Sequence, residues 1–429
     1  MKTTWLKTAL AVAVGALSSQ AMAAGFALNE QSISGMGTSF AGRSSSADDA
    51  TTLFGNPAGM SRLKREEVSF GMAAIHAKTD ISDNSAFTPQ GAGGLRAPVG
   101  GSNDGDMVPF TAVPMGYYVK PIDDKWAVGV GLYVPFGLIT DYESGFQGRY
   151  HGDYSEVRVI TVQPTVSYRF NEKLSVGFGP TINRIDGELQ SATINPLSPT
   201  FNDGRVKVKG DDTAVGFNAG ILYEFTPHTR MGLTYHSKVE YTLEGDTELK
   251  EGFSQLGIAG KYDASLDLTT PESIDLSITH ELNDQWTLYA GAMLTRWSRF
   301  EAIVIENEGI ASGPLNPIIE DQEWHDTWSY ALGTAYKLNR EWTLRTGLAF
   351  DQSPTNNVDR SPRIPSGDRT AVSFGLGWNP TEDITVDLAY SYLWEEDTKV
   401  RRDHPSKGIY NATYENSAHG FGAALSYRF

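Results

Sequence analysis

The sequence predicts an all-β fold. Fourteen antiparallel strands would close into a transmembrane barrel in a bacterial outer membrane, and a small N-terminal plug of short helices would fill the lumen. Three observations predict this fold. Apolar and polar residues alternate along much of the chain, tight turns alternate with long polar connections, and the N-terminus has the pattern of an exported protein. All three are typical of bacterial outer-membrane barrels.

The composition of the 429 residues narrows the class of protein. The formal net charge is −17, which argues against a nucleic-acid partner. There is no cysteine, and this excludes a disulfide scaffold, a cysteine-based zinc site and a thiol nucleophile. No apolar run reaches the roughly 18 residues that a membrane helix needs. The chain is also too aromatic for disorder and too rich in glycine for a helical fold.

Residues 1–23 are expected to be a secretory signal peptide. Lys2 and Lys7 give a positively charged start, Thr8 to Leu17 form a short apolar stretch, and Ala21-Met-Ala23 is a cleavage signal. The apolar stretch is too short to span a bilayer. The mature chain would then begin at Ala24, outside the cytoplasm.

Alternation is the dominant signal in the rest of the chain. From Ile160 to Phe170 every second residue is apolar, and the pattern recurs in residues 215–225, 342–350 and 384–392. A period of two gives a strand one apolar and one polar face. The non-apolar positions often hold glycine, serine, threonine, asparagine or aspartate.

Short turns and long connections give the strand count. The tight turns begin at Pro121, Asn171, Thr226, Asn283, Asn339 and Asn379. They join twelve strands, and one strand near residues 68–77 and another near 417–429 raise the count to fourteen, an even number as bacterial barrels require. The long connections are expected at residues 78–106, 135–154, 187–211, 244–263, 300–323, 354–367 and 398–411.

Aromatic residues near the turns distinguish a membrane barrel from a soluble β-sandwich or propeller. Trp126, Trp286 and Trp342 each follow a tight turn, and Phe170 and Phe225 each precede one. This spacing places aromatic rings at one height, as in the interfacial girdle of a membrane barrel. Closure of the barrel satisfies the backbone hydrogen bonds that lipid cannot.

Residues 24–64 do not alternate and are rich in glycine, alanine and serine. Ser46 to Asp49 fits a capping box that would open a short helix, and Gly55-Asn56-Pro57 would end it. We expect a plug inside a barrel formed by residues 65–429. The alternative is a disordered periplasmic tail.

An ordered series of segments adds a family resemblance. The segments are Ala24-Gly25-Phe26-x-Leu28-Asn29-Glu30, Ala47-Asp-Asp-Ala50, Asn56-Pro57-Ala58, Trp297-Ser298-x-Phe300 and Thr346 to Pro354. They resemble the FadL family of outer-membrane transporters of long-chain fatty acids, and the resemblance spans essentially the whole mature chain. It implies a fourteen-stranded barrel with an N-terminal hatch, in agreement with the strand count.

The resemblance also implies ligand-binding residues. Ala24, Gly25, Phe26 and Leu28, at the start of the hatch, would hold and gate the ligand. Arg184 on the fifth strand would meet its carboxylate group. Strict alternation points Arg184 towards lipid instead, so this role requires a bulge at Pro180 or a site above the apolar band. The alternative is an arginine in a salt bridge at the rim.

A side opening is implied near the hatch motif Asn56-Pro57-Ala58. In the family a kinked third strand forms this opening. Gly129, Gly131 and Pro135 permit a kink here, because glycine lacks a packing side chain and proline cannot donate to a strand ladder. Glycine on the small-residue face of a straight strand is the alternative.

A second family cation is missing after Trp297-Ser-Arg-Phe300. The chain reads Glu301-Ala-Ile-Val304 at that place, without a lysine. Arg296, Arg299 or Arg345 are the candidates to replace it.

No motif indicates catalysis or a resident metal. The eight histidines form no H-E-x-x-H pair, and neither a G-x-S-x-G elbow nor a D-x-D-x-D-G calcium loop occurs. His151 and His325 fall in or beside predicted outer loops, where a histidine is usually solvated. We therefore expect no catalytic residues, no metal and no cofactor.

The sequence thus predicts a passive outer-membrane transporter of hydrophobic molecules, with long-chain fatty acids favoured. Sideways release into the bilayer would avoid exposing the ligand tail to water, which costs about 0.8 kcal/mol per CH₂. Outer-membrane lipids and lipopolysaccharide would surround a monomeric barrel. The alternatives are an aromatic-hydrocarbon channel of the same family, a general porin, an outer-membrane hydrolase, and a channel that exports an oxidised lipid.

Overall fold

The computed structural model describes residues 25–90, 95–194, 203–254, 256–311, 313 and 315–429. The expected signal peptide, residues 1–23, and Ala24 lie outside the described residues. Among the described residues, no helix has both the length and the apolar character needed to cross a membrane.

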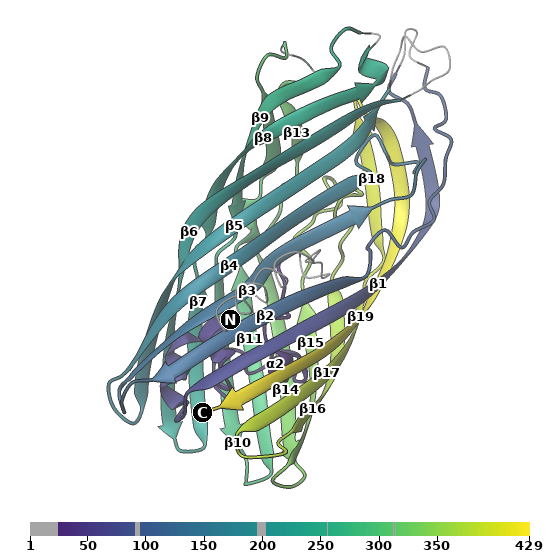
Figure 1. Ribbon diagram of the computed structural model, residues 1–429. Helices are drawn as coiled ribbons and strands as arrows, with labels where there is room; N and C mark the ends of the chain where they lie inside the picture. Colours follow the sequence, from purple (N-terminus) through teal and green to yellow (C-terminus); the bar gives the residue numbers. More distant parts are fainter. Residues whose placement is uncertain (1–24, 91–94, 195–202, 255, 312, 314) are drawn as a thin grey trace, which may run out of the picture.

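One antiparallel sheet closes into a tall barrel (Figure 1). The ring is closed by β1, which pairs with β2 on one side and with the last strand, β19, on the other. The strand segments are β1 (Glu67–Phe87), β2 (Thr111–Pro121), β3 (Trp126–Asp141), β4 (Tyr154–Arg169), β5 (Leu174–Thr193), β6 (Gly204–Thr226), β7 (Thr229–His236), β8 (Val239–Glu251), β9 (Gly260–Thr270), β10 (Ser273–Glu281), β11 (Trp286–Thr295), β12 (Ala302–Asn307), β13 (Ile318–Asp321), β14 (Thr327–Lys337), β15 (Trp342–Asp351), β16 (Arg369–Trp378), β17 (Ile384–Glu395), β18 (Thr398–His404) and β19 (Gly408–Arg428).

These segments make fourteen barrel strands, as predicted. Five barrel strands are interrupted once, so that each consists of two segments in line: β7 with β8, β9 with β10, β11 with β12, β13 with β14, and β17 with β18. The six predicted tight turns all join neighbouring strands at one end of the barrel.

The strands at the other end extend well into the regions predicted as long loops. β5 and β6 stay paired from Leu174–Tyr223 up to Thr193–Gly204, and β1 runs on to Phe87. The prediction was wrong there because these extensions turn their apolar side chains inwards, as Val206 and Val208 of β6 do. Their outer positions hold polar residues such as Lys207 and Lys209, so the apolar outer face of a membrane strand is missing. Pairing with the neighbouring strand still satisfies the backbone, and this is what keeps the segments extended.

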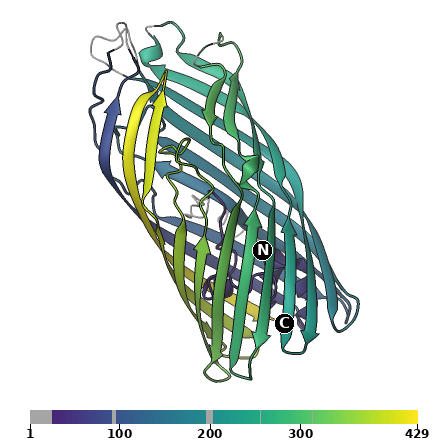
Figure 2. The ribbon, with the colours of Figure 1, turned by 180° about the vertical axis from the view of Figure 1, so that it is seen from behind.

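The wall is lower on the opposite side. β15 and β16 have 10 residues each, against 20 in β5 and 23 in β6. Figure 2 shows this side from behind. The connection between β15 and β16, residues 352–368, folds inwards over the lumen, where Arg363 donates to the backbone oxygen of Tyr154 on β4 at 2.8 Å.

The outer face of the barrel carries the apolar side chains. Large hydrophobic residues such as Phe178, Ile182 and Leu332 are about half or more exposed there. Near the tight turns, aromatic rings pair across neighbouring strands, as in Trp126 with Tyr168 at 4.5 Å between ring centroids. A band of apolar side chains edged by aromatic rings is the surface that a bilayer requires.

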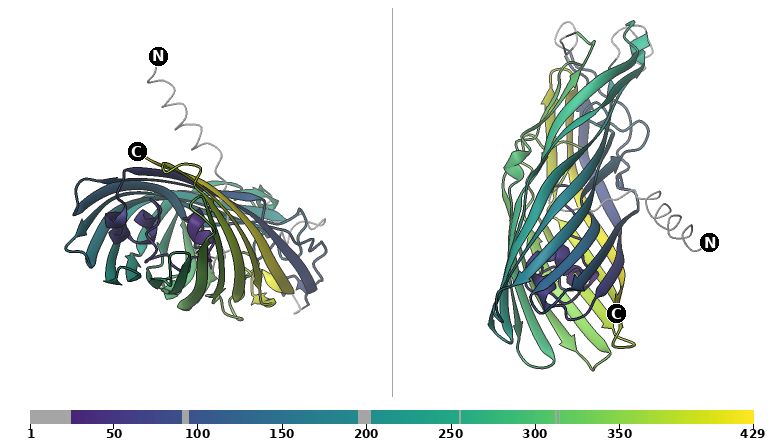
Figure 3. Two further views of the ribbon diagram at one scale, coloured as in Figure 1. Left: turned by 90° about the horizontal axis from the view of Figure 1, so that it is seen from below. Right: turned by 60° about the vertical axis from the view of Figure 1, so that its left-hand side comes forward.

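The chain before β1 lies inside the barrel at the end with the tight turns, as Figure 3 shows from below. We call residues 25–63 the hatch. Its helices are α2 (Ile33–Met36), α3 (Thr52–Gly55) and the 3-10 helix η1 (Pro57–Arg62).

The predicted capping box at Ser46 to Asp49 is wrong. α3 begins at Thr52, and the Asp49 carboxylate accepts a hydrogen bond from the Thr51 backbone N–H at 2.8 Å in a turn before the helix. The predicted end is right, since α3 stops at Gly55. Asn56 then caps η1, because its side-chain oxygen accepts from Ala58 N at 3.0 Å.

Glycines on the inner wall explain how closely the hatch packs. A Cβ atom added at Gly177 would lie 2.3 Å from the Pro57 carbonyl carbon, and one added at Gly232 would lie 1.7 Å from the Ser44 carbonyl oxygen. Such distances are impossible for any side chain. The hatch backbone therefore rests directly on the wall, and glycine is needed wherever it does so.

Candidate functional site

The wall of the barrel is parted between β2 and β3. The two strands pair from Pro121–Ala127 only as far as Gly116–Leu132. Beyond that point β2 remains paired with β1 up to Thr111, whereas β3 turns away from it. The sheet therefore has a gap bounded by the Thr111 half of β2 on one side and the second half of β3 on the other.

A β-bulge in β3 causes this separation. Tyr133 pairs with Thr161 of β4 and Phe136 pairs with Val159, so three residues of β3 span the length of two in β4. The extra residue falls at Val134-Pro135. A bulge bends its strand, and proline is tolerated in a sheet at such a place because it has no N–H to donate.

The start of the hatch occupies the edge that β3 leaves free. We call residues 25–28 the strap. Leu28 N donates to Pro135 O at 2.8 Å, and Gly137 N donates to Phe26 O at 2.9 Å. Just beyond the strap, the Gln31 side chain donates to Val134 O at 2.6 Å. The strap therefore replaces β2 as the neighbour of β3 across the bulge.

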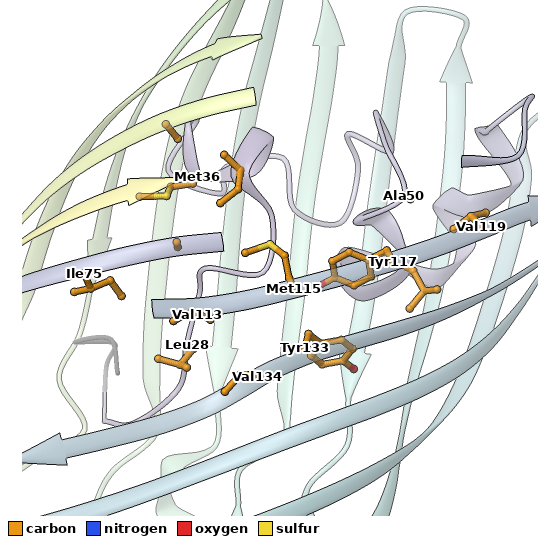
Figure 4. Close-up of a cluster of buried hydrophobic side chains, with 14 of the residues drawn as sticks. Leu28, Met36, Ala50, Ile75, Val113, Met115, Tyr117, Val119, Tyr133 and Val134 are labelled. Carbon is orange, nitrogen blue, oxygen red and sulfur yellow. The ribbon is translucent and has the colours of Figure 1, made fainter. Parts of the chain in front are cut away.

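The Leu28 side chain fills the gap. It is 3% exposed and belongs to a cluster with Val113 and Met115 of β2 and Val134 of β3 (Figure 4). The apolar contact closes the wall where backbone pairing is missing.

Phe26 is held in an aromatic cage. Its ring centroid lies 4.9 Å from Trp297, 5.6 Å from Phe300 and 5.9 Å from Trp324, and Phe136 of β3 is also in contact at 5.8 Å. Edge-on and tilted packing of this kind adds to the burial of each ring. Phe26 is 2% exposed, so the strap is anchored at its centre.

Gly25 fits against the same rings. Its φ angle is +67°, in the left-handed region that favours glycine, and a Cβ atom there would lie 2.6 Å from the Trp324 ring. Any larger residue would push the strap out of the cage.

An apolar cavity lies above the strap, on the side away from the tight turns. We call it the upper cavity. Phe26 and Phe300 line it, together with aliphatic side chains from the tall part of the wall, and Arg363 and Gln322 belong to its polar edge. The aliphatic residues are Leu138, Val157, Ile185, Leu189, Val208, Leu243, Leu266, Leu268, Ile303, Ile305 and Ile364.

A second cavity lies on the other side of the strap. We call it the lower cavity. Ala27, Leu28 and Phe136 line it, and so do Pro135 and Tyr133 next to the bulge. The strap therefore separates the two cavities and also covers the gap between β2 and β3. An apolar molecule in the upper cavity would therefore meet the strap before it could reach the lower cavity or the gap.

Known proteins place this arrangement in a family. A family model described as outer membrane protein transport protein (OMPP1/FadL/TodX) matches residues 14–429. The chain belongs to this family. It is accordingly an outer-membrane β-barrel, as the sequence predicted.

Relatives in the OMPP1/FadL/TodX family match along their whole length. The chain is 31% identical over 458 residues to the long-chain fatty acid transport protein of Escherichia coli O6:H1, with 100% of this chain and 99% of that protein covered. It is 30% identical over 466 residues to outer membrane protein P1 of Haemophilus influenzae, with 99% and 98% covered.

Solved structures of the family share the fold. The crystal structure of a Pseudomonas aeruginosa FadL homologue superimposes with a TM-score of 0.84 at 25% identity, covering 95% of this chain and 100% of that one. The Ralstonia pickettii toluene transporter TbuX gives a TM-score of 0.66 at 19% identity, covering 92% and 97%.

Arg184 does not lie where the family resemblance suggested. It follows the alternation of β5 and points outwards, with a side chain that is 52% exposed and an ion pair to Asp211 of β6 at 2.8 Å. β5 pairs with both neighbours without a register shift, so Pro180 forms no bulge that would turn Arg184 inwards. This position does not fit contact with a ligand in either cavity.

Gly129 and Gly131 also have a different surrounding from the one expected. Both face inwards, and a Cβ atom at either position would lie within 2.9 Å of the Leu53 side chain in α3. They make room for the hatch, whereas the bend in β3 is at Val134-Pro135. Of the three residues expected at the kink, only Pro135 lies in the bulge.

The motif Asn56-Pro57-Ala58 fastens the hatch to the wall. The Asn56 amide donates to Ser44 O at 2.7 Å within the hatch and to Ile221 O of β6 at 3.0 Å. Pro57 lies against Gly177 of β5. The motif is thus a fixed point of the hatch on β5 and β6, away from the gap.

The three candidate replacement cations are all engaged elsewhere. Arg296 pairs with Asp326 at 2.6 Å, Arg299 with Glu272 at 2.8 Å, and Arg345 with Asp387 at 2.6 Å. None of them lines the upper or the lower cavity.

The sequence did not single out Arg363, one of the charged residues that line the upper cavity beside Glu156, Glu188 and Lys209. Arg363, in the connection between β15 and β16, pairs with Glu320 of β13 at 2.9 Å, and Lys407 contacts the same carboxylate. Burial alone would raise the pKa of Glu320, but these two cations outweigh it and hold the pKa well below its usual range. The ion pairs fix two outer connections to the barrel wall.

His151 is not the solvated loop residue that was expected. It is buried, and burial, together with Lys407 and Arg402, lowers its pKa to about 3. His325 is exposed, as expected. Their spacing in the sequence carries no signal for this difference, because burial depends on the inward fold of residues 352–368 and 405–407.

Proposed function

We propose that the protein passively carries long-chain fatty acids, or closely similar hydrophobic carboxylic acids, from the cell exterior into the outer membrane. The ligand enters the upper cavity, the strap shifts, and the ligand leaves sideways through the gap between β2 and β3. One observation carries the proposal: the strap, residues 25–28, is at once the floor of the upper cavity and the cover of the gap.

The relatives favour this substrate class. Those with about 30% identity over the full chain include long-chain fatty acid transport proteins of enteric bacteria. The similarity to two toluene transporters and a monoaromatic hydrocarbon channel, at 18–20% identity, concerns the fold. A tail of many CH₂ groups would gain about 0.8 kcal/mol for each group transferred from water into the aliphatic upper cavity.

The strap is suited to move. Only two backbone hydrogen bonds join it to β3, and each contributes about 1 kcal/mol net. Phe26 and Leu28 supply the rest of its hold through apolar contacts that a hydrophobic ligand would replace. We propose that Ala24 and Gly25 move with them, while Asn56-Pro57-Ala58 keeps the rest of the hatch on the wall.

No step of this path requires catalysis, a metal or a cofactor. The whole path lies within one barrel, so the proposal is for a monomer. Outer-membrane lipid receives the ligand at the gap, and lipopolysaccharide surrounds the outer end of the barrel.

Uptake of labelled oleate tests the proposal. Cells that lack their own fatty-acid transporter are compared with and without this protein, after its presence in the outer membrane has been confirmed. We expect a clear and saturable gain in uptake. No gain with oleate but a gain with toluene would favour an aromatic-hydrocarbon channel, and entry of small hydrophilic solutes alone would favour a porin.

A further inference from the structure

The lower cavity has an unusual polar lining for so acidic a protein. The chain has 52 Asp and Glu residues, yet none of the residues described around this cavity is acidic. Its polar groups are one arginine, one histidine, three asparagines and several hydroxyl groups, namely Arg43, His236, Asn29, Asn183, Asn218, Thr161, Thr181, Ser237, Ser273 and Thr295. A cavity with a cation, neutral donors and no acid attracts an anion.

Arg43 is the charged group of this cavity, and no carboxylate neutralises it at close range. Among the described residues, its guanidinium donates to the Asn29 side-chain oxygen at 2.7 Å and to the Met293 sulfur at 3.2 Å. It also lies over the Phe40 ring, 5.2 Å from the centroid. Thioether sulfur is a weak acceptor, so part of the hydrogen-bonding capacity of Arg43 remains poorly used.

Other arginines that line cavities differ in this respect. Arg345 has the carboxylate of Asp387 at 2.6 Å, and Arg363 has that of Glu320 at 2.9 Å. Arg43 is half-buried, and a half-buried guanidinium without a paired anion keeps part of its charge unneutralised. Among the described residues it forms no ion pair within 4.0 Å.

The acids near Arg43 line other cavities. Glu30, Asp275 and Asp351 line one of them together with Arg43, and Asp48 and Asp49 line another. Asp275 accepts a short hydrogen bond from the Ser44 hydroxyl, and neither Glu30 nor Asp275 forms an ion pair with Arg43 within 4.0 Å. An anion in the lower cavity would therefore approach the face of Arg43 that these acids do not occupy.

We propose that Arg43 binds the carboxylate group of the transported acid in the lower cavity. This inference rests on the proposed function and adds a second binding site on the path, one that distinguishes carboxylic acids from neutral hydrocarbons. The headgroup lies on Arg43 of the hatch, and the tail lies against Leu28 and Phe136, which line the same cavity beside the bulge.

The same contact connects headgroup binding to the strap. Arg43 holds Asn29, which follows the strap directly in the chain. A carboxylate that takes up the guanidinium N–H groups competes with the Asn29 side chain. Binding of the acid therefore removes one of the contacts that keep the strap in place.

Binding to the full-length protein in lipid nanodiscs tests the role of Arg43. The probes are oleate and methyl oleate, which share the tail but differ in charge. The Arg43→Gln variant should bind oleate about 10- to 100-fold more weakly, as expected for loss of a charge-assisted hydrogen bond, with binding of methyl oleate changed by less than about 2-fold. Arg43→Lys should keep most of the oleate affinity, because it keeps the charge.

Arg340→Gln is the matched control. Arg340 is exposed in the turn between β14 and β15. Its substitution by glutamine removes the same charge from the chain as Arg43→Gln does. Its binding of both probes should equal that of the wild type, and all variants should show the heat-modifiable gel mobility of a folded barrel.

Three results would overturn the inference. One is equal oleate binding by Arg43→Gln and the wild type; another is an equal loss for both probes, which would indicate a structural role. The third needs no variant: a wild-type protein that binds methyl oleate as tightly as oleate has no headgroup site. If the wild type binds neither probe, the proposed function itself fails.

Discussion

Two parts of the barrel wall have the same kind of sequence and opposite properties. β5 and β6 pair without a break from one end of the barrel to the other, whereas β2 and β3 separate beyond Gly116–Leu132. Both pairs alternate, and each of the four strands is joined to one neighbour by a short turn at the same end of the barrel. The difference is one extra residue in β3 and a segment from the distant N-terminus that takes the place of β2.

The comparison shows how a closed barrel provides a side opening without a free edge. An unpaired strand edge in lipid would leave backbone groups unsatisfied. The strap satisfies them, but with two backbone hydrogen bonds and the side chains of Phe26 and Leu28 instead of a full ladder. The continuous ladder between β5 and β6 stays closed, whereas the contact between the strap and β3 can open and close again.

A disulfide bond between the strap and β3 should have the largest effect, because it would make this part of the wall as permanent as the β5–β6 pair. Ala27 and Phe136 are direct antiparallel partners, so their Cα atoms lie about 4.5–5.5 Å apart, within the range for a disulfide. The chain has no cysteine of its own. We expect Ala27→Cys with Phe136→Cys to abolish oleate uptake under oxidising conditions and a reductant to restore it.

The two single-cysteine variants are the controls for the disulfide and should transport oleate equally well with and without oxidant. Undiminished uptake by the oxidised double variant, with the disulfide verified by mass spectrometry, would show that the strap does not need to move.

Loss of the Phe26 ring should have the next largest effect. Phe26→Ala removes the floor of the upper cavity and the anchor of the strap, and burial of a phenylalanine side chain contributes about 1.5–3 kcal/mol. We expect the Kd for oleate to rise by about 10-fold or more in a titration. Phe110→Ala, at a residue that is 67% exposed, should leave the Kd unchanged. An unchanged Kd in Phe26→Ala would remove Phe26 from the binding site.

Crowding the seat of the hatch should have a smaller effect. Gly232→Ala places a Cβ atom against Ser44 O, and overpacking of this kind costs about 1–3 kcal/mol. The barrel should still fold, but the hatch should be cleaved faster by protease. Gly116→Ala, where the added atom meets only the Phe70 ring, is the control. Equal cleavage rates in the two variants would contradict the close packing of the hatch.

The pH dependence of the outer connections should show the smallest effect. An unfolded imidazole takes up a proton near pH 6.5, whereas His151 stays neutral down to about pH 3. The unfolded state therefore binds more protons between these values, so stability is lost as the pH falls from 6.5 towards 3. At pH 6 the loss should be about 1 kcal/mol.

The His151→Gln variant should lack that part of the pH dependence. The measurement is the temperature of unfolding at pH 7 and pH 6 for the variant and the wild type. The same slope in both would mean that His151 titrates in the folded protein.

The sequence alone was sufficient where the signal is local. Alternation and the six turns predicted fourteen strands. The two-residue period of side-chain direction belongs to each strand by itself and does not depend on its neighbours. The same rule predicted that Arg184 faces outwards, whereas the family resemblance implied contact with the ligand. In the structure Arg184 faces outwards. Pro135 was also a readable signal, since proline is restricted to edges and bulges in any sheet.

The tertiary structure decided which distant residues meet. Phe26 lies against Trp297 and Trp324, and Gly232 lies against Ser44. The lone cation of the lower cavity is Arg43 of the hatch, a residue that no motif marked. These neighbours come from places hundreds of residues apart, brought together by closure of the barrel around the hatch. The sequence thus determined the strands and their faces, because these follow from local sterics and hydrophobicity. The site was visible only in the tertiary structure, because the side chains that line its cavities are far apart in the sequence.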